Sequence, residues 1–379
     1  MRLTGDWIEA EPTQRVLKML EEGGHQALLV GGCVRNSALG APVNDIDIAS
    51  DARPERVIEL AKAAGLKPVP TGVDHGTVTV VADGHPHEVT TFRRDVETHG
   101  RHATVAFSDD IAEDAARRDF TMNALYARSD GTILDPLGTG LEDLAAHHVR
   151  FVGEAEERIR EDYLRILRFF RFTAWYGHDL DPDGLAACAE NIAGIETLSR
   201  ERLGGEMRKL LAAPDPVHAV AAMAQCGVLT AVLPGADATA LGPLVHLEDR
   251  PADPIRRLAA IGGEDVAERL RLSKKDTRQL EALRASLSDG EDAAVLGYRL
   301  GAETGADALL LRHALMGQEM PEGWQNRVYF GAKQQFPVQA KDLMPRYEGK
   351  ALGDTLKALE ARWIASGFTL AREDLLAAL

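Results

Sequence analysis

Two aspartates separated by one residue, Asp45 and Asp47, are the first candidates for chemistry in this 379-residue chain. They stand in residues 44–48, where a strand would turn both carboxylates to one face and the two isoleucines to the other. Like charges on one face repel each other, and carboxylate oxygens at this spacing suit Mg²⁺, which also takes phosphates and water. An edge strand with a solvated acidic face is the alternative interpretation.

A glycine pair precedes these aspartates. The apolar run 28–30 predicts a short buried strand, Gly31 and Gly32 predict a tight turn, and residues 33–39 predict a helix that ends at Gly40. Backbone N–H groups at the start of a helix are a place where phosphate oxygens bind. A phosphate cradle close to metal-binding carboxylates predicts nucleotide chemistry with Mg²⁺ as the cofactor.

These motifs carry a family resemblance. The pattern Gly-Gly-x-x-Arg followed by Asp-x-Asp, present as LVGGCVR and NDIDIAS, resembles the nucleotidyltransferase superfamily in its class II branch, the tRNA CCA-adding enzymes and bacterial poly(A) polymerases. The resemblance implies that Arg35 helps the glycine pair to position phosphates, and that the two aspartates hold two Mg²⁺ ions. Asn36 departs from the pattern, because the family usually has Asp there, so no charge role is assigned to this position.

A third carboxylate, Glu88, is a candidate on a predicted hairpin. Residues 71–82 alternate like a strand, the Asp-Gly pair at 83–84 predicts a hairpin turn, and residues 87–92 predict the returning strand. If this strand pairs beside that of Asp47, Glu88 can join the site, and EVTTFR resembles the family strand that carries such a carboxylate. A simple exposed Glu is the alternative.

Donors and one acceptor gather in the segment RRDFTMNA, residues 117–124. Arginines bind triphosphate oxygens through forked hydrogen bonds, and an Asp can accept from ribose hydroxyls. The segment resembles the second motif of the family, which implies that Arg118 and Asp119 contact the ribose end of the nucleotide and that Asn123 lies nearby. A surface ion cluster that caps a helix is the alternative for the first three residues.

From about residue 151 the pattern becomes helical, and a helix is predicted over residues 151–172. Asp162 and Arg165 lie three residues apart on its polar side, so spacing alone favours an ordinary ion pair. The segment EDYLRILRFFRF, however, resembles the family motif E-D-x-x-R, whose Asp and Arg act as a template for the incoming base. Arg168, one turn further on, is assigned to nucleotide binding with them.

Such a template has a physical basis. A carboxylate accepts from the exocyclic amine of cytosine or adenine, and a guanidinium donates to acceptors on either ring. Guanine and uracil would set a carbonyl against the carboxylate and leave buried polar groups unpaired. The later motif S-x-E-R, from Ser199 to Arg202, begins a predicted helix over 199–211 and is expected to brace the preceding helix.

Composition limits the class of protein. No apolar run approaches the length of a membrane span, the N-terminus has no signal-peptide pattern, and the three cysteines lack metal spacing, so a cytoplasmic protein without a membrane partner is expected. The net charge of −16 argues against nucleic acid unless Arg and Lys gather on one face, which we expect here.

Together these patterns predict an α+β protein. A nucleotidyltransferase-type head with a mixed β-sheet and helices occupies 1–150, a helical neck for base selection occupies 151–213, and a helical body and tail for tRNA binding occupy 214–379. The predicted function is template-independent addition of CCA to the 3′ end of tRNA from CTP and ATP by two-metal phosphoryl transfer. Which protein partners it has, if any, does not follow from the sequence.

Two alternatives remain. A poly(A) polymerase, or an enzyme that adds only CC or only A, would share the same motifs. The polar stretch 93–110 predicts a loop that resembles, loosely, the flexible loop with which the family changes from C to A addition, and its full length argues against a CC-only enzyme. A catalytically inactive RNA-binding protein is the alternative from another class, and the intact aspartate pair argues against it.

Overall fold

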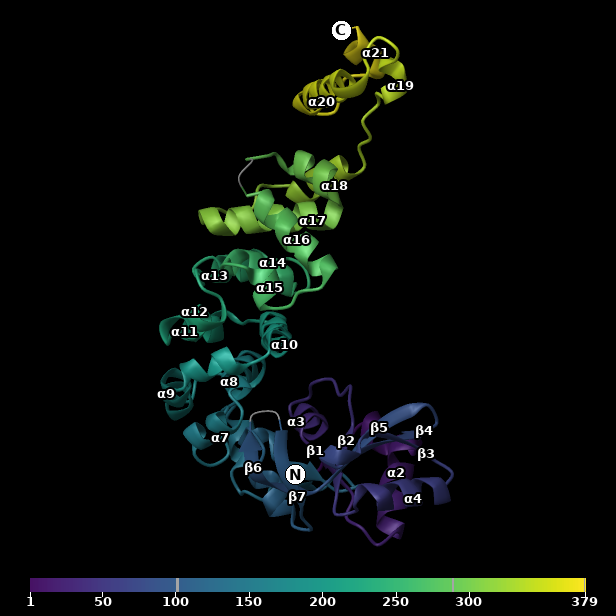
Figure 1. The fold of residues 1–379 in the computed structure, drawn as a ribbon, viewed down its shortest axis with the longest axis vertical. Helices are drawn as coiled ribbons and strands as arrows, with labels where there is room; N and C mark the ends of the chain where they lie inside the picture. The colour runs from purple at the N-terminus through teal and green to yellow at the C-terminus, as the bar shows by residue number, and fades with distance from the viewer. Residues whose placement is uncertain (100–101, 288–289, 378) are drawn as a thin grey trace. The chain divides into compact units, whose positions relative to one another are not determined.

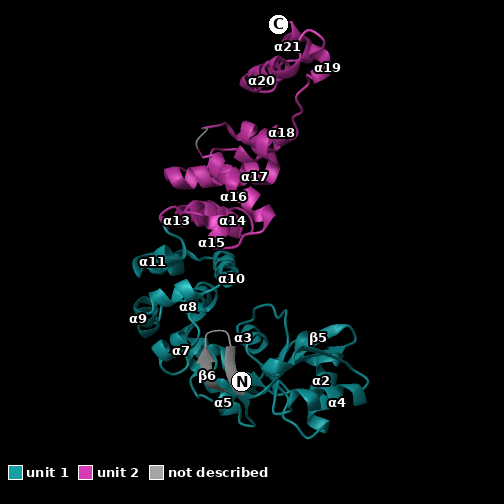
Figure 2. Cartoon of the chain, viewed as in Figure 1, with its two compact units in different colours: residues 1–234 teal, residues 235–379 magenta. Residues whose placement is uncertain are grey.

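The computed structural model describes residues 1–99, 102–287, 290–377 and 379. The chain divides into two compact units, residues 1–234 and residues 235–379 (Figure 2). The first unit contains every residue that the sequence assigns to metal or nucleotide binding, so the candidate site is built within it. The three-way division at 150 and 213 stays a prediction.

A mixed sheet of seven strands, counted over the described residues, forms the head of the first unit (Figure 1). Its strands are β1 (Leu28–Val30), β2 (Asp47–Ser50), β3 (Lys67–Gly72), β4 (Thr77–Ala82), β5 (His85–Thr91), β8 (Tyr126–Ala127) and β9 (Ile133–Leu134). They lie in the order β3-β4-β5-β2-β1-β8-β9, and β2 and β5 run parallel while the other neighbours are antiparallel. The predicted mixed sheet is confirmed.

One face of this sheet packs against two helices, α2 (Glu11–Glu22) and α4 (Pro54–Ala63). Alternate strand residues point into this core and are fully buried: Ile48, Val78, Val80 and Val89. The residues between them point to the opposite face, where Thr79, Glu88 and Asp47 are in register across β4, β5 and β2. The apolar core therefore fixes which face carries the carboxylates.

Two segments of the head differ from the prediction. The strand expected over 71–82 begins only at Thr77, because a 3₁₀ turn, η1 (Val73–His75), precedes it. The loop expected over 93–110 contains an antiparallel pair, β6 (Arg93–His99) and β7 (His102–Phe107), while residues 100 and 101 lie outside the described residues. The β6–β7 hairpin forms a separate two-stranded sheet. Its polar sequence lacks the alternation of apolar and polar residues from which the strands of the seven-stranded sheet were predicted.

The rest of the first unit is helical, as predicted from residue 151 onward. Its other helices are α1 (Asp6–Glu9), α3 (Gly32–Ala38), α5 (Ile111–Ala116), α6 (Gly140–Ala145), α7 (Ala155–Glu161), α8 (Leu164–Tyr176), α9 (Pro182–Glu190), α10 (Arg200–Leu211), α11 (Val217–Gln225) and α12 (Val228–Val232), with 3₁₀ turns η2 (Thr121–Asn123) and η3 (Ile192–Thr197). The predicted helices over 33–39 and 199–211 are confirmed as α3 and α10.

The single helix predicted over 151–172 is wrong. Helix α7 ends at Glu161 and α8 begins at Leu164, and Asp162 between them has the extended conformation φ −153°, ψ 103°. The ring of Tyr163, within the break, packs so closely on Gly194 that a Cβ there would lie 2.0 Å from it. The apolar residues keep a helical spacing both before and after Asp162, so the sequence pattern alone does not reveal the break. The break coincides with this tertiary contact, which can override local helix propensity.

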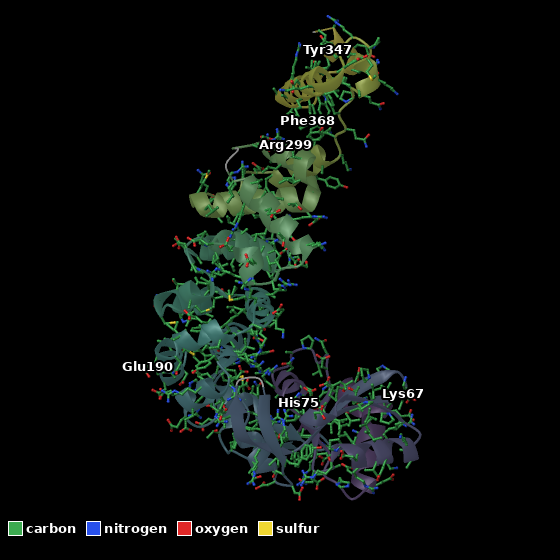
Figure 3. The ribbon with its side chains drawn as sticks, in the orientation of Figure 1. Lys67, His75, Glu190, Arg299, Tyr347 and Phe368 are labelled. Carbon is green, nitrogen blue, oxygen red and sulfur yellow. The ribbon has the colours of Figure 1, made fainter. Side chains whose placement is uncertain are left out.

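The second unit is built from helices, as predicted. They are α13 (Leu241–Leu247), α14 (Pro254–Ile261), α15 (Val266–Arg269), α16 (Lys274–Ala285), α17 (Ala293–Met316), α18 (Trp324–Ala332), α19 (Ala340–Leu343), α20 (Gly349–Ala365) and α21 (Arg372–Leu376). Near its C-terminal end, Tyr347 and Phe368, which are labelled in Figure 3, belong to an apolar cluster that includes the buried Trp363. Across the described ranges, no helix is both long enough and apolar enough to span a membrane.

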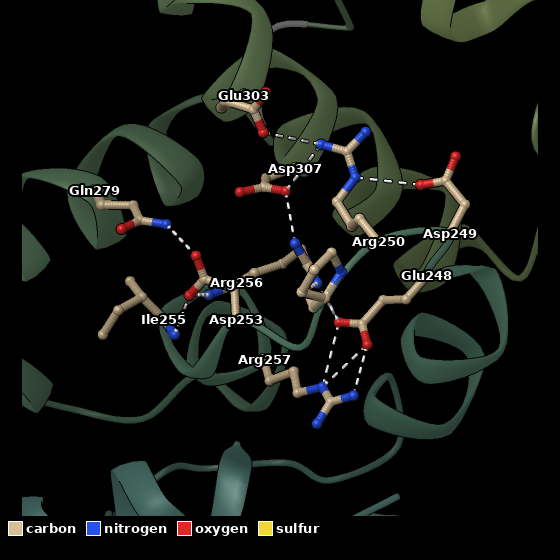
Figure 4. Close-up of polar contacts among 11 residues, drawn as sticks. Glu248, Asp249, Arg250, Asp253, Ile255, Arg256, Arg257, Gln279, Glu303 and Asp307 are labelled. Carbon is tan, nitrogen blue, oxygen red and sulfur yellow. Dashed lines mark hydrogen bonds and ion pairs between the residues drawn. The ribbon is translucent and has the colours of Figure 1, made fainter. Parts of the chain in front are cut away.

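Two buried arginines organise the start of α14. Arg256 and Arg257 pair with Glu248 at 2.9 and 2.6 Å, and Arg256 also pairs with Asp307 at 2.8 Å (Figure 4). Each guanidinium is thus balanced by a carboxylate, which buried charges require. The network joins α14 to Glu248, at the end of α13, and to Asp307 on α17.

Candidate active site

The glycine turn after β1 lies against an arginine from a distant segment. Gly31 has a φ of 69°, a conformation that favours glycine, and a Cβ placed there would come within 3.5 Å of Arg118 Nη1. Helix α3 begins at Gly32, directly after this turn. A helix start and a guanidinium therefore lie together, which is a combination of donors suited to phosphate oxygens.

Arg118 is held in place by Asp114 and Tyr126. Its Nη2 donates to Asp114 Oδ2 at 3.0 Å, its Nε donates to the Tyr126 hydroxyl at 3.0 Å, and that hydroxyl donates to Asp114 Oδ2 at 2.7 Å. Burial would raise the pKa of Asp114, but Arg118 and Arg117 lower it to about 2. Among the described residues Nη1 of Arg118 has no hydrogen-bond partner, so this atom can meet a phosphate.

The three carboxylates meet where β2 begins, beside the middle of β5. Asp47 is the first residue of β2 and the register partner of Glu88 on β5. Asp45 lies in the loop before β2, so the strand predicted over 44–48 is wrong at its start, although the Ile46 C=O still accepts from the Glu88 N–H at 3.2 Å. All three carboxylate residues line one cavity of about 600 Å³.

The charges around this cavity favour a cation. Burial raises the pKa of Asp47, as do Glu88 and Asp45, whereas Arg118 lowers it. A divalent ion would relieve this repulsion, and hard oxygen donors suit Mg²⁺. Within the described ranges no three His, Cys, Asp or Glu side chains form a ready-made metal cage. Two carboxylates completed by water and phosphate are therefore the arrangement that fits, with Glu88 as their charged neighbour.

Asp119 is fully engaged by protein donors. Its Oδ1 accepts from the Phe120 N–H and from Asn123 Nδ2, both at 2.9 Å. Its Oδ2 accepts from Arg168 Nε at 2.8 Å and from Arg168 Nη2 at 2.5 Å. Burial would raise the pKa of Asp119, but Arg168 and Asn123 lower it to about 2. Four donors match the acceptor capacity of one carboxylate, so a ribose hydroxyl must displace one of them to bind here.

Arg35 faces the neck. It is 7% exposed, its Nη1 donates to Asn123 Oδ1, and its Nη2 donates to the Tyr176 hydroxyl at 3.0 Å. The guanidinium also lies over the Tyr176 ring at 4.2 Å from its centre. The hydrogen-bonded path Arg168–Asp119–Asn123–Arg35 therefore joins four of the predicted site residues in one buried network. Sequence reasoning missed Tyr176. The feature that could have identified it is its position at the end of α8, the helix that also carries Arg165 and Arg168.

Asp162 and Arg165 each have their own partner. Asp162 Oδ2 pairs with Arg202 Nη2 at 2.6 Å, and Asp162 Oδ1 accepts from the Leu164 N–H at 3.2 Å, which caps α8. Arg165 Nη1 pairs with Glu161 Oε2 at 2.5 Å. The predicted i, i+3 geometry is wrong because the helix breaks at Asp162, and the brace expected from the S-x-E-R motif is confirmed by the Arg202 contact.

Comparison with known proteins defines the class. A family model described as "Poly A polymerase head domain" matches residues 27–150, and one described as "Probable RNA and SrmB- binding site of polymerase A" matches residues 177–239. The solved "Crystal structure of Bacillus stearothermophilus CCA-adding enzyme in complex with CTP" has a TM-score of 0.78, 30% identity, and coverage of 94% of this chain and 93% of that chain. The fold is that of a nucleotidyltransferase.

Curated relatives identify the family. "CCA tRNA nucleotidyltransferase 1, mitochondrial" of Mus musculus is 31% identical over 97% of this chain and 89% of its own length. The "CCA-adding enzyme" of Geobacillus stearothermophilus is 42% identical over 58% of this chain and 54% of its own length. The chain spans about half the length of the first curated relatives that it matches. The chain belongs to the CCA-adding tRNA nucleotidyltransferase family.

Proposed function

We propose that this chain adds CCA to the 3′ end of tRNA, using CTP and ATP. The observation that carries the proposal is the gathering of Asp45, Asp47 and Glu88 at one cavity. Arg118 is close enough to Asp47 to lower its pKa, and the Gly31 turn lies beside Arg118. Relatives support it, since one solved relative is a CCA-adding enzyme in complex with CTP, and a Thermotoga maritima enzyme of the same fold is complexed with tRNA. A cytoplasmic location is part of the proposal.

The metal site is proposed at Asp45 and Asp47. Nucleotidyltransferases of this family use a divalent metal ion, and we assign Mg²⁺ because the donor set is of carboxylate oxygens. Asp45 and Asp47 would hold such ions, which when bound would supply activation of the attacking 3′-hydroxyl and neutralisation of the charge on the leaving pyrophosphate. Glu88 would add a third negative charge beside them.

The remaining residues bind and orient the nucleotide. The Gly31 N–H already donates to the Leu125 C=O at 3.2 Å, so the Gly31 turn acts by placing the start of α3 at Gly32 beside Arg118. The backbone N–H of Gly32, together with Arg118 Nη1, is suited to the triphosphate. Asp162 and Arg165 are proposed to select cytosine and adenine by accepting from the amine and donating to the ring. The assignment of Asp119 to the ribose requires that a hydroxyl displace one of its four present donors.

Arg35, Asn123 and Arg168 are proposed to act in nucleotide binding by holding the head against the neck. Their donors and acceptors are used on one another and on Asp119, so they orient the walls of the site. This differs from the direct phosphate contact that the motif alone implied for Arg35.

The test is extension of tRNA transcripts that end at the discriminator base, at C, or at CC. Purified protein would receive Mg²⁺ with CTP and ATP, singly and together, and products would be resolved at single-nucleotide length. Addition of C, C and A followed by a stop is the expected result. A long A ladder on any RNA would instead identify a poly(A) polymerase, CC or A alone would identify a partial enzyme, and no product would favour an inactive RNA-binding protein.

A further inference from the structure

Asn36, the residue at which the sequence departs from the family pattern, has a defined place in the structure. Its Oδ1 accepts from Arg35 Nε at 3.2 Å and from Arg35 Nη2 at 2.9 Å. Its Nδ2 donates to the backbone carbonyl of Pro42 at 2.9 Å. Because one end of the amide meets donors and the other meets an acceptor, the orientation of the side chain follows from its partners.

Pro42 belongs to the loop between α3 and β2, which carries Asp45 to the cavity. Near its start, the Ala41 N–H donates to the Asn36 C=O at 2.8 Å, and near its end Ile46 is paired to β5. Between these two points, the bond from Asn36 Nδ2 is the hydrogen bond that holds the loop backbone among the described residues. A loop with so few hydrogen bonds opens readily when one is removed.

On its other side, Asn36 is anchored to the neck through Arg35. The Arg35 guanidinium is buried, donates to the Tyr176 hydroxyl at 3.0 Å and stacks on the ring of that tyrosine. Tyr176 ends α8, the helix that also carries Arg165 and Arg168. A buried contact between head and neck therefore sets the position of the Asn36 amide.

We propose that Asn36 is a positioning residue, which fixes the Asp45 loop and thereby the geometry of the metal site; this inference rests on the proposed function. An Asp, the usual family residue, could accept from Arg35 but has no hydrogen to donate to Pro42. Its second oxygen would instead face the Pro42 carbonyl oxygen and repel it. The amide therefore stabilises the loop in a way that a carboxylate does not.

Two substitutions separate this role from a general effect on folding. Asn36→Asp keeps the acceptor for Arg35 and removes the donor to Pro42, whereas Asn36→Ala removes both. Burial lowers the pKa of Arg35, so a carboxylate beside it favours the charged guanidinium, and the melting temperature of Asn36→Asp should not fall. Asn36→Ala should melt lower than wild type, because Arg35 loses an acceptor.

The readout is equilibrium binding of Mn²⁺, measured without RNA or nucleotide from the loss of the free-ion electron paramagnetic resonance signal. Both variants should bind Mn²⁺ about five-fold more weakly, which corresponds to about 1 kcal/mol, the net contribution of one hydrogen bond. Arg56→Ala, which removes an exposed ion pair with Glu59 on α4, is the matched control and should change neither measurement.

The outcomes are distinct. Mn²⁺ binding by Asn36→Asp equal to that of wild type overturns the inference, and so does a loss of affinity accompanied by an equal loss of stability in both variants. Wild-type Mn²⁺ binding that Asp47→Asn leaves unchanged overturns the proposed metal site, and this inference with it. Weaker binding by Asn36→Asp at undiminished stability supports the positioning role.

Discussion

Replacing Asp162 with Ala tests whether this carboxylate reads the base. Asp162 pairs with Arg202 at 2.6 Å with both side chains 23% exposed, and it caps α8 through the Leu164 N–H. Losing the half-buried pair costs about 1 kcal/mol and losing the cap about 1 kcal/mol. For a unit of this size, the melting temperature should fall by roughly 4–8 °C and the protein should remain folded.

The selectivity of Asp162→Ala should change far more than its stability. A rejected base leaves a buried polar group unpaired at a cost of about 1–3 kcal/mol, so the preference for CTP over UTP should fall about 10- to 100-fold. The assay is single-nucleotide incorporation into a tRNA transcript that lacks CCA, and the quantity compared is the ratio of kcat/KM for CTP to kcat/KM for UTP.

Arg202→Ala is the matched control for this experiment. It removes the same ion pair and should cost about 1 kcal/mol of stability, but it leaves the Asp162 carboxylate and its cap in place. Its CTP preference should therefore stay close to that of wild type. An unchanged preference in Asp162→Ala would refute the reasoning, as would an equal loss of preference in Arg202→Ala.

Other predictions concern the hydrogen-bond and ion-pair networks within each of the two units. Arg168→Met should lower the free energy of unfolding by about 2 kcal/mol at pH 7, because Asp119 loses the partner that lowers its pKa to about 2. This difference from wild type should shrink as the pH falls from about 4 to about 2, because Asp119 becomes protonated and its lowered pKa no longer stabilises the fold. Urea unfolding of both proteins at a series of pH values measures this difference. Tyr176→Phe, which loses the Arg35 hydrogen bond but keeps the ring contact, should cost about 1 kcal/mol in thermal unfolding. Glu248→Gln should weaken the second unit by about 3 kcal/mol, visible as faster amide exchange in α14, because Arg256 and Arg257 each lose a buried ion pair, while Asp307 still pairs with Arg256.

Local patterns predicted the elements that position the carboxylates. The Gly31 turn and the Asp83–Gly84 hairpin turn follow from glycine placement, and strand alternation sets Asp47 and Glu88 on the faces opposite their buried apolar neighbours. These features depend on near neighbours in the sequence, for which short-range physics is sufficient. The pairing of β2 with β5, which sets Glu88 beside Asp47, joins distant segments and was expected only on the condition that the two strands are neighbours.

Contacts between distant segments could not be predicted in this way. The helix break at Asp162 accompanies the packing of Tyr163 on Gly194, thirty-one positions along the chain. The four donors on Asp119 include two from Arg168 on a different helix. A sequence motif names these residues, but it does not state whether their polar atoms face a ligand or one another.

The arrangement of Arg35 shows why that distinction matters for function. The aspartate loop of its motif lines the cavity, yet the donors of Arg35 are directed to Asn123, Asn36 and Tyr176. Helix α8, which carries Arg165, is thus joined to the loop of Asp45 by a short run of hydrogen bonds that links Tyr176, Arg35, Asn36 and Pro42. Because each bond fixes the direction of the next, a change in the neck can alter metal geometry without touching a metal ligand. The residues proposed for base selection and those proposed for the metal site are therefore joined by one set of hydrogen bonds, although they come from separate motifs.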